Sequence, residues 1–132
     1  MIKIIANSNS NLFCEAKHEP SGITLKTDAP KDVGGNASSF SPTDLVGTAL
    51  LTCIMTTMGL VANKLEIDLT GMNGSVEKNM TATKPRRIEK LTVTLDIPVP
   101  YHEKLEHAAH NCPVHHSLHP DTIMDIQLNW KV

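Results

Sequence analysis

The chain has 132 residues, of which 40% are hydrophobic, 20% are charged and 3% are aromatic, and its formal net charge is −2. This balance is typical of a soluble globular protein, and the length predicts a single domain over residues 1–132 with a core of its own. The absence of a basic excess argues against a nucleic-acid surface, and the shortage of aromatic residues argues against base stacking.

The N-terminal segment and the cysteine count together predict a cellular compartment. Residues 1–7 alternate in a way that is typical of a strand, and they are too short for the apolar region of a signal peptide. Three cysteines are an odd number, which does not suit a framework of paired disulfides. We therefore expect a cytoplasmic, reducing environment in which the thiols start reduced.

The first third of the sequence predicts strands and one long loop. Apolar residues alternate around positions 2–5, 12–18 and 23–25, and turn residues occupy positions 20–22. Residues 28–41 are rich in glycine, serine and proline, which predicts a loop. Loops of this length in compact domains often serve a functional site.

A long helix is predicted to begin after Ser41 and to end near Lys64 or Leu65. Ser41 can cap it, Pro42 suits its first position, and Asp44 completes a capping pattern. Residues 45–63 carry no charge and include 12 apolar residues, so a membrane span must be considered. Because no Lys/Arg cluster flanks this segment and threonines and glycines dilute it, we expect a helix buried in protein and no membrane partner.

The remainder predicts strands around a second helical region. Residues 69–74 and 75–83 suggest strands, and the clean alternation over residues 91–97 indicates a half-buried strand. Helical spacing follows over residues 101–112, and Pro113 suits the start of a new short helix with Cys112 at its cap. Residues 124–130 form a closing strand, and the element order predicts an α+β fold.

Two cysteines are the candidate functional residues. Cys112 is predicted at a helix N-terminus one turn from His115 and His116, a setting that lowers the pKa of a thiol. A buried cap cysteine without chemistry fits the same position. Cys53 lies in an apolar helix and suits an inert core thiol unless a cation, a donor or a second thiol faces it. Cys14 is interpreted as structural.

A histidine-rich segment raises the question of metal binding. Six histidines lie between positions 102 and 119, with Cys112 among them. Their spacing matches no zinc-ligand pattern and no Cys-x-x-Cys pair accompanies them, so we expect neither a metal nor a cofactor. A His/Cys metal-binding module is kept as the weakest alternative.

The segment from Ser41 to Cys53, Ser-Pro-Thr-Asp-Leu-Val-Gly-Thr-Ala-Leu-Leu-Thr-Cys, resembles the signature of the OsmC/Ohr family. A preceding Gly-Gly loop and the Cys-Pro-Val-His turn at Cys112 extend the resemblance over nearly the whole chain. The resemblance implies an OsmC-like α+β fold, with a long central helix packed against antiparallel sheets in an intertwined homodimer. It further implies active sites at the subunit interface and an antioxidant role in a stress response.

The same resemblance implies a thiol-dependent peroxidase that reduces organic hydroperoxides. Cys53 would attack the hydroperoxide and become a sulfenic acid, Cys112 would resolve it as a disulfide, and a dithiol reductant such as a lipoyl group would restore the pair. The apolar residues around Cys53 favour an alkyl or lipid-like hydroperoxide over hydrogen peroxide.

Two departures from the family pattern leave an alternative open. Catalytic members have a glutamate directly after the helix proline and an arginine from the N-terminal strands. This chain has Thr43 at the first position and no arginine before Arg86. The alternative is a binding protein of the same fold, with an apolar interface pocket and little or no peroxidase activity.

Overall fold

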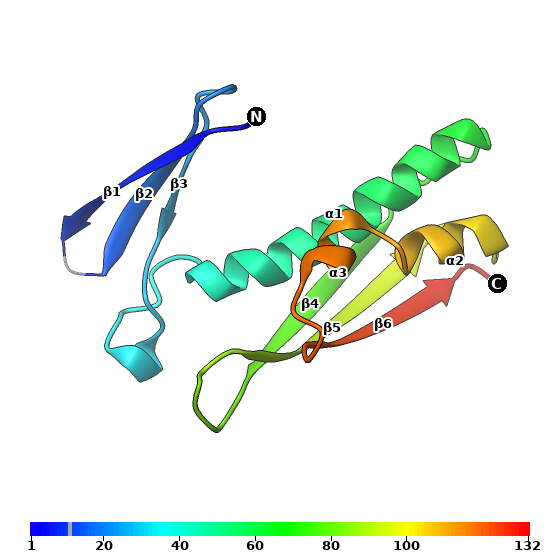
Figure 1. Ribbon diagram of the computed structural model, residues 1–132. Helices are drawn as coiled ribbons and strands as arrows, with labels where there is room; N and C mark the ends of the chain where they lie inside the picture. Colours follow the sequence, from blue (N-terminus) through cyan, green and yellow to red (C-terminus); the bar gives the residue numbers. More distant parts are fainter. Residues whose placement is uncertain (11) are drawn as a thin grey trace. The chain divides into compact units, whose positions relative to one another are not determined.

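The computed structural model describes residues 1–10 and 12–132, which divide into two compact units, residues 1–45 and residues 46–132 (Figure 1). Each unit contains one three-stranded sheet. The chain forms, in order, strands, a long helix, strands, two short helices and a final strand, which confirms the predicted α+β class. The single domain predicted over residues 1–132 stays a prediction.

The first unit is an antiparallel sheet of β1 (Ile4–Ser10), β2 (Phe13–His18) and β3 (Thr24–Thr27). Its apolar side chains are largely uncovered, with Ile4 64% exposed and Ile23 69% exposed. Three strands need a covered hydrophobic face to be stable in water. This sheet therefore lacks a core of its own.

The loop after β3 is organised around the buried carboxylate of Asp28. This carboxylate accepts hydrogen bonds from the N–H of Ala29 (2.8 Å) and from the N–H and hydroxyl of Ser38 (3.0 and 2.8 Å). The loop also contains a short 3-10 helix, η1 (Lys31–Val33). At Gly35 any side chain would collide with the backbone oxygen of Ala29, so glycine is required there.

The chemical shift of the Ser38 amide proton is expected to report the titration of Asp28, with a midpoint below the ordinary pKa of an aspartate. Hydrogen bonds from Ser38 stabilise the ionised form and hold the pKa of Asp28 below its ordinary value of 3.8. The carboxylate therefore stabilises the loop above the unfolded-state pKa, and this contribution is lost as the pH falls through the lowered value. An NMR titration of the Ser38 amide checks this, and a midpoint at or above 3.8 contradicts it.

Helix α1 (Pro42–Lys64) begins and ends as the sequence predicts. The N–H of Ser41 donates to Asp44 Oδ2 (2.8 Å), and the N–H of Asp44 donates to Ser41 Oγ (3.1 Å), which is a reciprocal capping box. At the other end Glu66 adopts a left-handed conformation (φ 57°) and the N–H of Ile67 donates to the carbonyl of Ala62 (2.9 Å). This hydrogen bond pairs a backbone carbonyl of the last turn, and the left-handed residue ends the helix.

By length and composition, α1 would be able to cross a membrane, although core helices of soluble proteins share these properties. Only 28% of its apolar window is buried within the protomer. The buried residues form one stripe, with Leu50, Ile54, Met58 and Ala62 four positions apart. The rest of the helix leaves apolar surface for another covering partner.

The second unit contains β4 (Asn73–Met80), β5 (Ile88–Ile97) and β6 (Ile123–Trp130). β4 pairs with β5 antiparallel, but β6 pairs with β5 in parallel. The antiparallel sheets that the resemblance implies therefore include one parallel strand pair here. Parallel neighbours need a crossover, which here carries α2 (Glu103–Ala109) and α3 (Pro113–Ser117).

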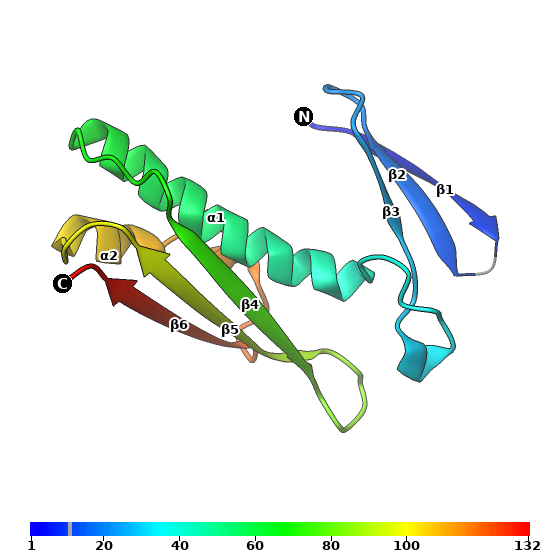
Figure 2. The same cartoon turned by 180° about the vertical axis from the view of Figure 1, so that it is seen from behind.

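The core of this unit lies between the sheet and its helices. The predicted alternation on β5 is confirmed, because the side chains of Leu91, Val93, Leu95 and Ile97 are buried. They pack with the buried stripe of α1 and with Leu105 of α2. Figures 1 and 2 show α1, α2 and α3 on one face of the sheet, so the crossover passes beside the long helix.

Candidate functional site

The crossover brings the two predicted cysteines together. Cys53 lies in the middle of α1, and Cys112 lies between α2 and α3. The thiol of Cys53 lies close enough to Cys112 to raise its pKa, and both thiols are free. Cys53 is half-buried, whereas Cys112 is 0% exposed. One sulfur of the pair is therefore accessible from outside and the other is enclosed.

Cys112 occupies the cap position that the sequence predicts. Pro113 starts α3, and the N–H of His115 donates to Cys112 Sγ at 3.3 Å. The N–H of Val114 is also directed at this sulfur. A sulfur that accepts backbone N–H groups is fixed in orientation, so α3 holds Cys112 towards α1.

The predicted lowering of the pKa of Cys112 is wrong. Burial raises its pKa above the ordinary value, and the neighbouring thiol of Cys53 raises it further. The N–H groups of His115 and Val114 act in the opposite direction but do not outweigh desolvation. Cys112 therefore keeps its proton at neutral pH, and its reaction as a thiolate requires a base.

Few polar groups accompany Cys53. Its sulfur lies 4.0 Å from the hydroxyl of Thr57, one helical turn along α1. The first arginines of the sequence lie in the loop between β4 and β5, where Arg87 donates to the carbonyl of Ile88. Among the described residues, the groups that shift the pKa of Cys112 include no cation. The groups that act on Cys112 are thus the backbone N–H groups of His115 and Val114 and the thiol of Cys53.

A groove of about 610 Å³ lies between α1 and α2, and its lining includes Thr57, the residue whose hydroxyl lies 4.0 Å from the sulfur of Cys53. Thr57 and Val61 contribute one wall, and Ala108 and Asn111 contribute to the other. Glu103, Lys104 and His107 complete the lining. The sequence analysis missed this groove, although its residues stand four and eight positions after Cys53 and one and four positions before Cys112.

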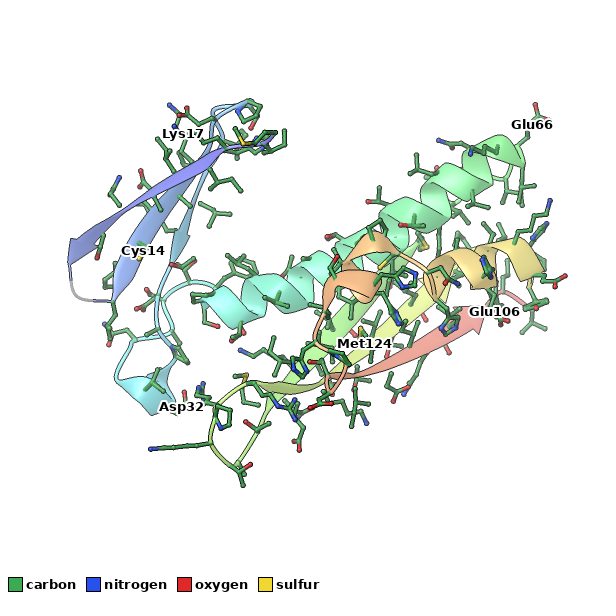
Figure 3. The ribbon with its side chains drawn as sticks, viewed as in Figure 1. Cys14, Lys17, Asp32, Glu66, Glu106 and Met124 are labelled. Carbon is green, nitrogen blue, oxygen red and sulfur yellow. The ribbon has the colours of Figure 1, made fainter. Side chains whose placement is uncertain are left out.

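The third cysteine lies apart from the core. Cys14 is on β2 of the first unit, where its side chain is exposed (Figure 3). Within the protomer Cys14 is not packed, so its interpretation as structural stays a prediction. In experiments on the thiol pair, Cys14 must be replaced to avoid side reactions.

The histidine-rich segment shows no metal-like arrangement. Within residues 1–10 and 12–132, no three His, Cys, Asp or Glu side chains gather closely enough to hold a metal ion. His102 and His119 instead accept hydrogen bonds from backbone N–H groups, of Lys104 and Asp121 respectively. The rings of His115 and His116 lie 5.6 Å apart.

Comparison with known proteins identifies the family to which this chain is similar. The family model described as OsmC-like protein matches residues 34–127. Comparison with curated proteins gave no match. A structure from Psychrobacter arcticus 273-4, named for an osmotic stress induced and detoxification response, is 32% identical with a TM-score of 0.89, and the match covers 97% of this chain and 96% of that one.

Two further structures share the fold at lower identity. An organic hydroperoxide resistance protein OsmC from Legionella pneumophila is 18% identical, with a TM-score of 0.74 over 98% of this chain and 96% of that one. An organic hydroperoxide resistance protein from Elizabethkingia anophelis is 16% identical, with a TM-score of 0.78 over 99% and 96%. These likenesses agree with the OsmC-like fold expected from the sequence.

Proposed function

The chain belongs to the OsmC-like protein family, and from this premise we propose that it is a thiol-dependent peroxidase that reduces organic hydroperoxides. The observation that carries the proposal is the proximity of two free thiols, Cys53 and Cys112, which lie close enough that Cys53 raises the pKa of Cys112. The names of the Legionella and Elizabethkingia structures, which refer to organic hydroperoxide resistance, support the same chemistry.

Accessibility assigns the roles within the pair. The half-buried thiol of Cys53 attacks the terminal oxygen of the hydroperoxide, which breaks the O–O bond, releases an alcohol and leaves a sulfenic acid. The enclosed thiol of Cys112 then attacks this sulfur, forming a disulfide and releasing water. A dithiol reductant such as a lipoyl group then attacks the accessible sulfur of Cys53 and releases Cys112.

A hydroperoxide pulse tests the proposal in a Cys14→Ser background. One equivalent of an alkyl hydroperoxide is expected to remove two titratable thiols and to leave a Cys53–Cys112 disulfide that peptide mass spectrometry identifies. A disulfide needs the two Cα atoms about 5.5–6 Å apart, and the proximity of the two thiols favours this. Retention of both thiols after the pulse would contradict the proposal.

The substrate is expected to be an alkyl hydroperoxide. The groove that begins one helical turn after Cys53, at Thr57, includes Val61 and Ala108, and apolar lining stabilises an alkyl group but not hydrogen peroxide. One buried methylene contributes about 0.8 kcal/mol, so a chain of several carbons is expected to raise kcat/KM by about tenfold or more. Steady-state kinetics with both peroxides check this, and a higher kcat/KM for hydrogen peroxide contradicts it.

A binding protein of the same fold is the second candidate. The groove of about 610 Å³ favours it, and among the described residues no cation shifts the pKa of Cys112. In that case the Cys53→Ser variant still binds a medium-chain fatty acid in a calorimetric titration, and hydroperoxide consumes no thiols in the parent protein. Loss of thiols without ligand binding excludes this alternative.

We also propose that the protein is a homodimer. The uncovered face of α1 and the exposed strands of the first unit leave apolar surface that a second copy would cover. Light scattering after gel filtration is expected to give twice the protomer mass of 14.4 kDa. A mass of one protomer at micromolar concentration would contradict the assembly, and detergent-dependent solubility would favour a membrane instead.

The proposed chemistry fits the cytoplasm. Three free cysteines, one of them exposed, persist in a reducing compartment, where a dithiol reductant can also regenerate the enzyme. Subcellular fractionation of the producing cell is expected to recover the protein in the cytoplasmic fraction. Recovery in an oxidising compartment would overturn this part of the proposal.

A further inference from the structure

The side chain of Thr57 connects the thiol of Cys53 with the groove between α1 and α2. Thr57 stands one helical turn after Cys53 on α1, and its Oγ1 lies 4.0 Å from Cys53 Sγ. The same residue lines the groove, together with Val61 of α1 and Ala108 of α2. A molecule that extends from the groove to the sulfur of Cys53 therefore lies beside this hydroxyl.

The hydroxyl of Thr57 makes a different contact from that of an ordinary helical threonine. Threonine hydroxyls within helices commonly donate to the carbonyl four residues earlier, and Thr52 does so, because its Oγ1 donates to the carbonyl of Thr48 at 2.8 Å. The contact of the Thr57 hydroxyl is with the side chain of Cys53 instead, and either atom could be the donor. A separation of 4.0 Å is long for a hydrogen bond, so the hydroxyl proton stays available for a closer acceptor.

Reduction of a hydroperoxide creates negative charge on one defined oxygen. The sulfur attacks the terminal oxygen, the O–O bond breaks, and its electron pair stays on the oxygen that carries the alkyl group. Before the attack the terminal oxygen lies about 3–3.5 Å from the sulfur, and the departing oxygen lies one bond farther out. The Thr57 hydroxyl, 4.0 Å from the same sulfur, is thus within range of the departing oxygen when the alkyl group extends into the groove.

We propose that Thr57 is a catalytic residue whose hydroxyl donates a hydrogen bond to the departing oxygen of the hydroperoxide, an inference that rests on the proposed peroxidase function of Cys53. The thiol proton of Cys53 passes to solvent before the attack, and the terminal oxygen with its hydrogen becomes the sulfenic acid. The departing oxygen keeps the electron pair of the O–O bond and takes a proton from water to leave as the alcohol. A donor already placed where charge develops stabilises the transition state without reorganisation.

The first test removes the hydroxyl in a Cys14→Ser background. Thr57→Val keeps the β-branched shape of the side chain, and its kcat/KM for an alkyl hydroperoxide is expected to fall by about ten- to hundredfold, because one donor to a developing charge is lost. Thr57→Ser retains a hydroxyl and is expected to stay close to the parent's value. Thr57→Ala is a second variant without the hydroxyl and should follow the valine variant.

The leaving group separates this role from a merely structural one. A peroxy acid such as peracetic acid is attacked in the same way but releases a carboxylate, a weak base that gains little from a donor. With peracetic acid the loss in Thr57→Val is therefore expected to be much smaller than with an alkyl hydroperoxide. Alkylation of Cys53 by iodoacetamide creates no oxygen anion, so its rate is expected to be the same in Thr57→Val and in the parent.

Thr52→Val is the matched control, because it makes the same substitution on α1 at an exposed threonine whose hydroxyl donates to a backbone carbonyl. It should keep the parent's kinetics, and an unchanged far-UV spectrum shows that each variant is folded.

Two results overturn the inference while the proposed function stands. One is a Thr57→Val variant with the parent's kcat/KM for the alkyl hydroperoxide. The other is an equal loss with the alkyl hydroperoxide, peracetic acid and iodoacetamide, which would place the effect of Thr57 on the sulfur or on the fold. If the parent itself consumes neither hydroperoxide nor thiols, the proposed function fails, and the role of Thr57 fails with it.

Discussion

The Cys53→Ser variant is expected to lose hydroperoxide turnover by about a thousandfold or more, because serine supplies no thiolate and cannot form a sulfenic acid. Turnover is measured as hydroperoxide consumption with a dithiol reductant in excess. Cys112→Ser is expected to differ in kind. It lacks the resolving thiol but retains the accessible one, so one equivalent of hydroperoxide should leave a sulfenic acid on Cys53 that a dimedone-type reagent traps.

Cys14→Ser is the matched control for these two variants. It makes the same chemical change at an exposed cysteine of the first unit and is expected to leave turnover unchanged. Full turnover in the Cys53→Ser variant would remove that thiol from the mechanism. A sulfenic acid trapped on Cys112 instead would reverse the two roles, despite the burial of that sulfur.

The Ile54→Ala variant is expected to lower the free energy of unfolding by about 3 kcal/mol, within the range for large-to-small changes in a core. Ile54 is 0% exposed and belongs to the stripe of α1 that packs against β5, so alanine leaves a cavity there. Urea denaturation at one fixed protein concentration measures the change, since assembly also contributes to apparent stability.

Ile123→Ala makes the same substitution at an exposed site. Ile123 is 56% exposed at the start of β6, and its replacement is expected to lower the free energy of unfolding by less than about 1 kcal/mol. Equal losses in the two variants would show that the stripe of α1 is not the centre of the core. Ile54 follows Cys53 directly in α1, so the Ile54→Ala variant is also expected to form the Cys53–Cys112 disulfide more slowly than the parent protein.

The sequence alone predicts those features of the fold and the site that depend on residues within one or two turns of each other. The capping box of Ser41 and Asp44 lies within one turn, and the start of α1 follows from it. The alternation that buries Leu91 and its neighbours is visible in the sequence. Pro113 marks the start of α3, and with it the cap position of Cys112. The resemblance to a known family then supplied the expectation that the two cysteines meet.

Other features depend on how distant segments pack. The parallel pairing of β5 with β6 sends the crossover past α1, and this path brings Cys112 to Cys53. The same packing buries Cys112 completely and raises its pKa, against the expectation from a helix N-terminus beside histidines. It also encloses Nδ1 of His115 without a partner.

The sequence by itself therefore determined the elements, their caps and the two thiols, because propensity, capping and periodicity act over one or two turns. Only the tertiary structure decided the solvent exposure of each thiol and the groups that surround it. The protonation of Cys112 follows from desolvation, and desolvation is a property of the assembled core rather than of neighbours in the chain.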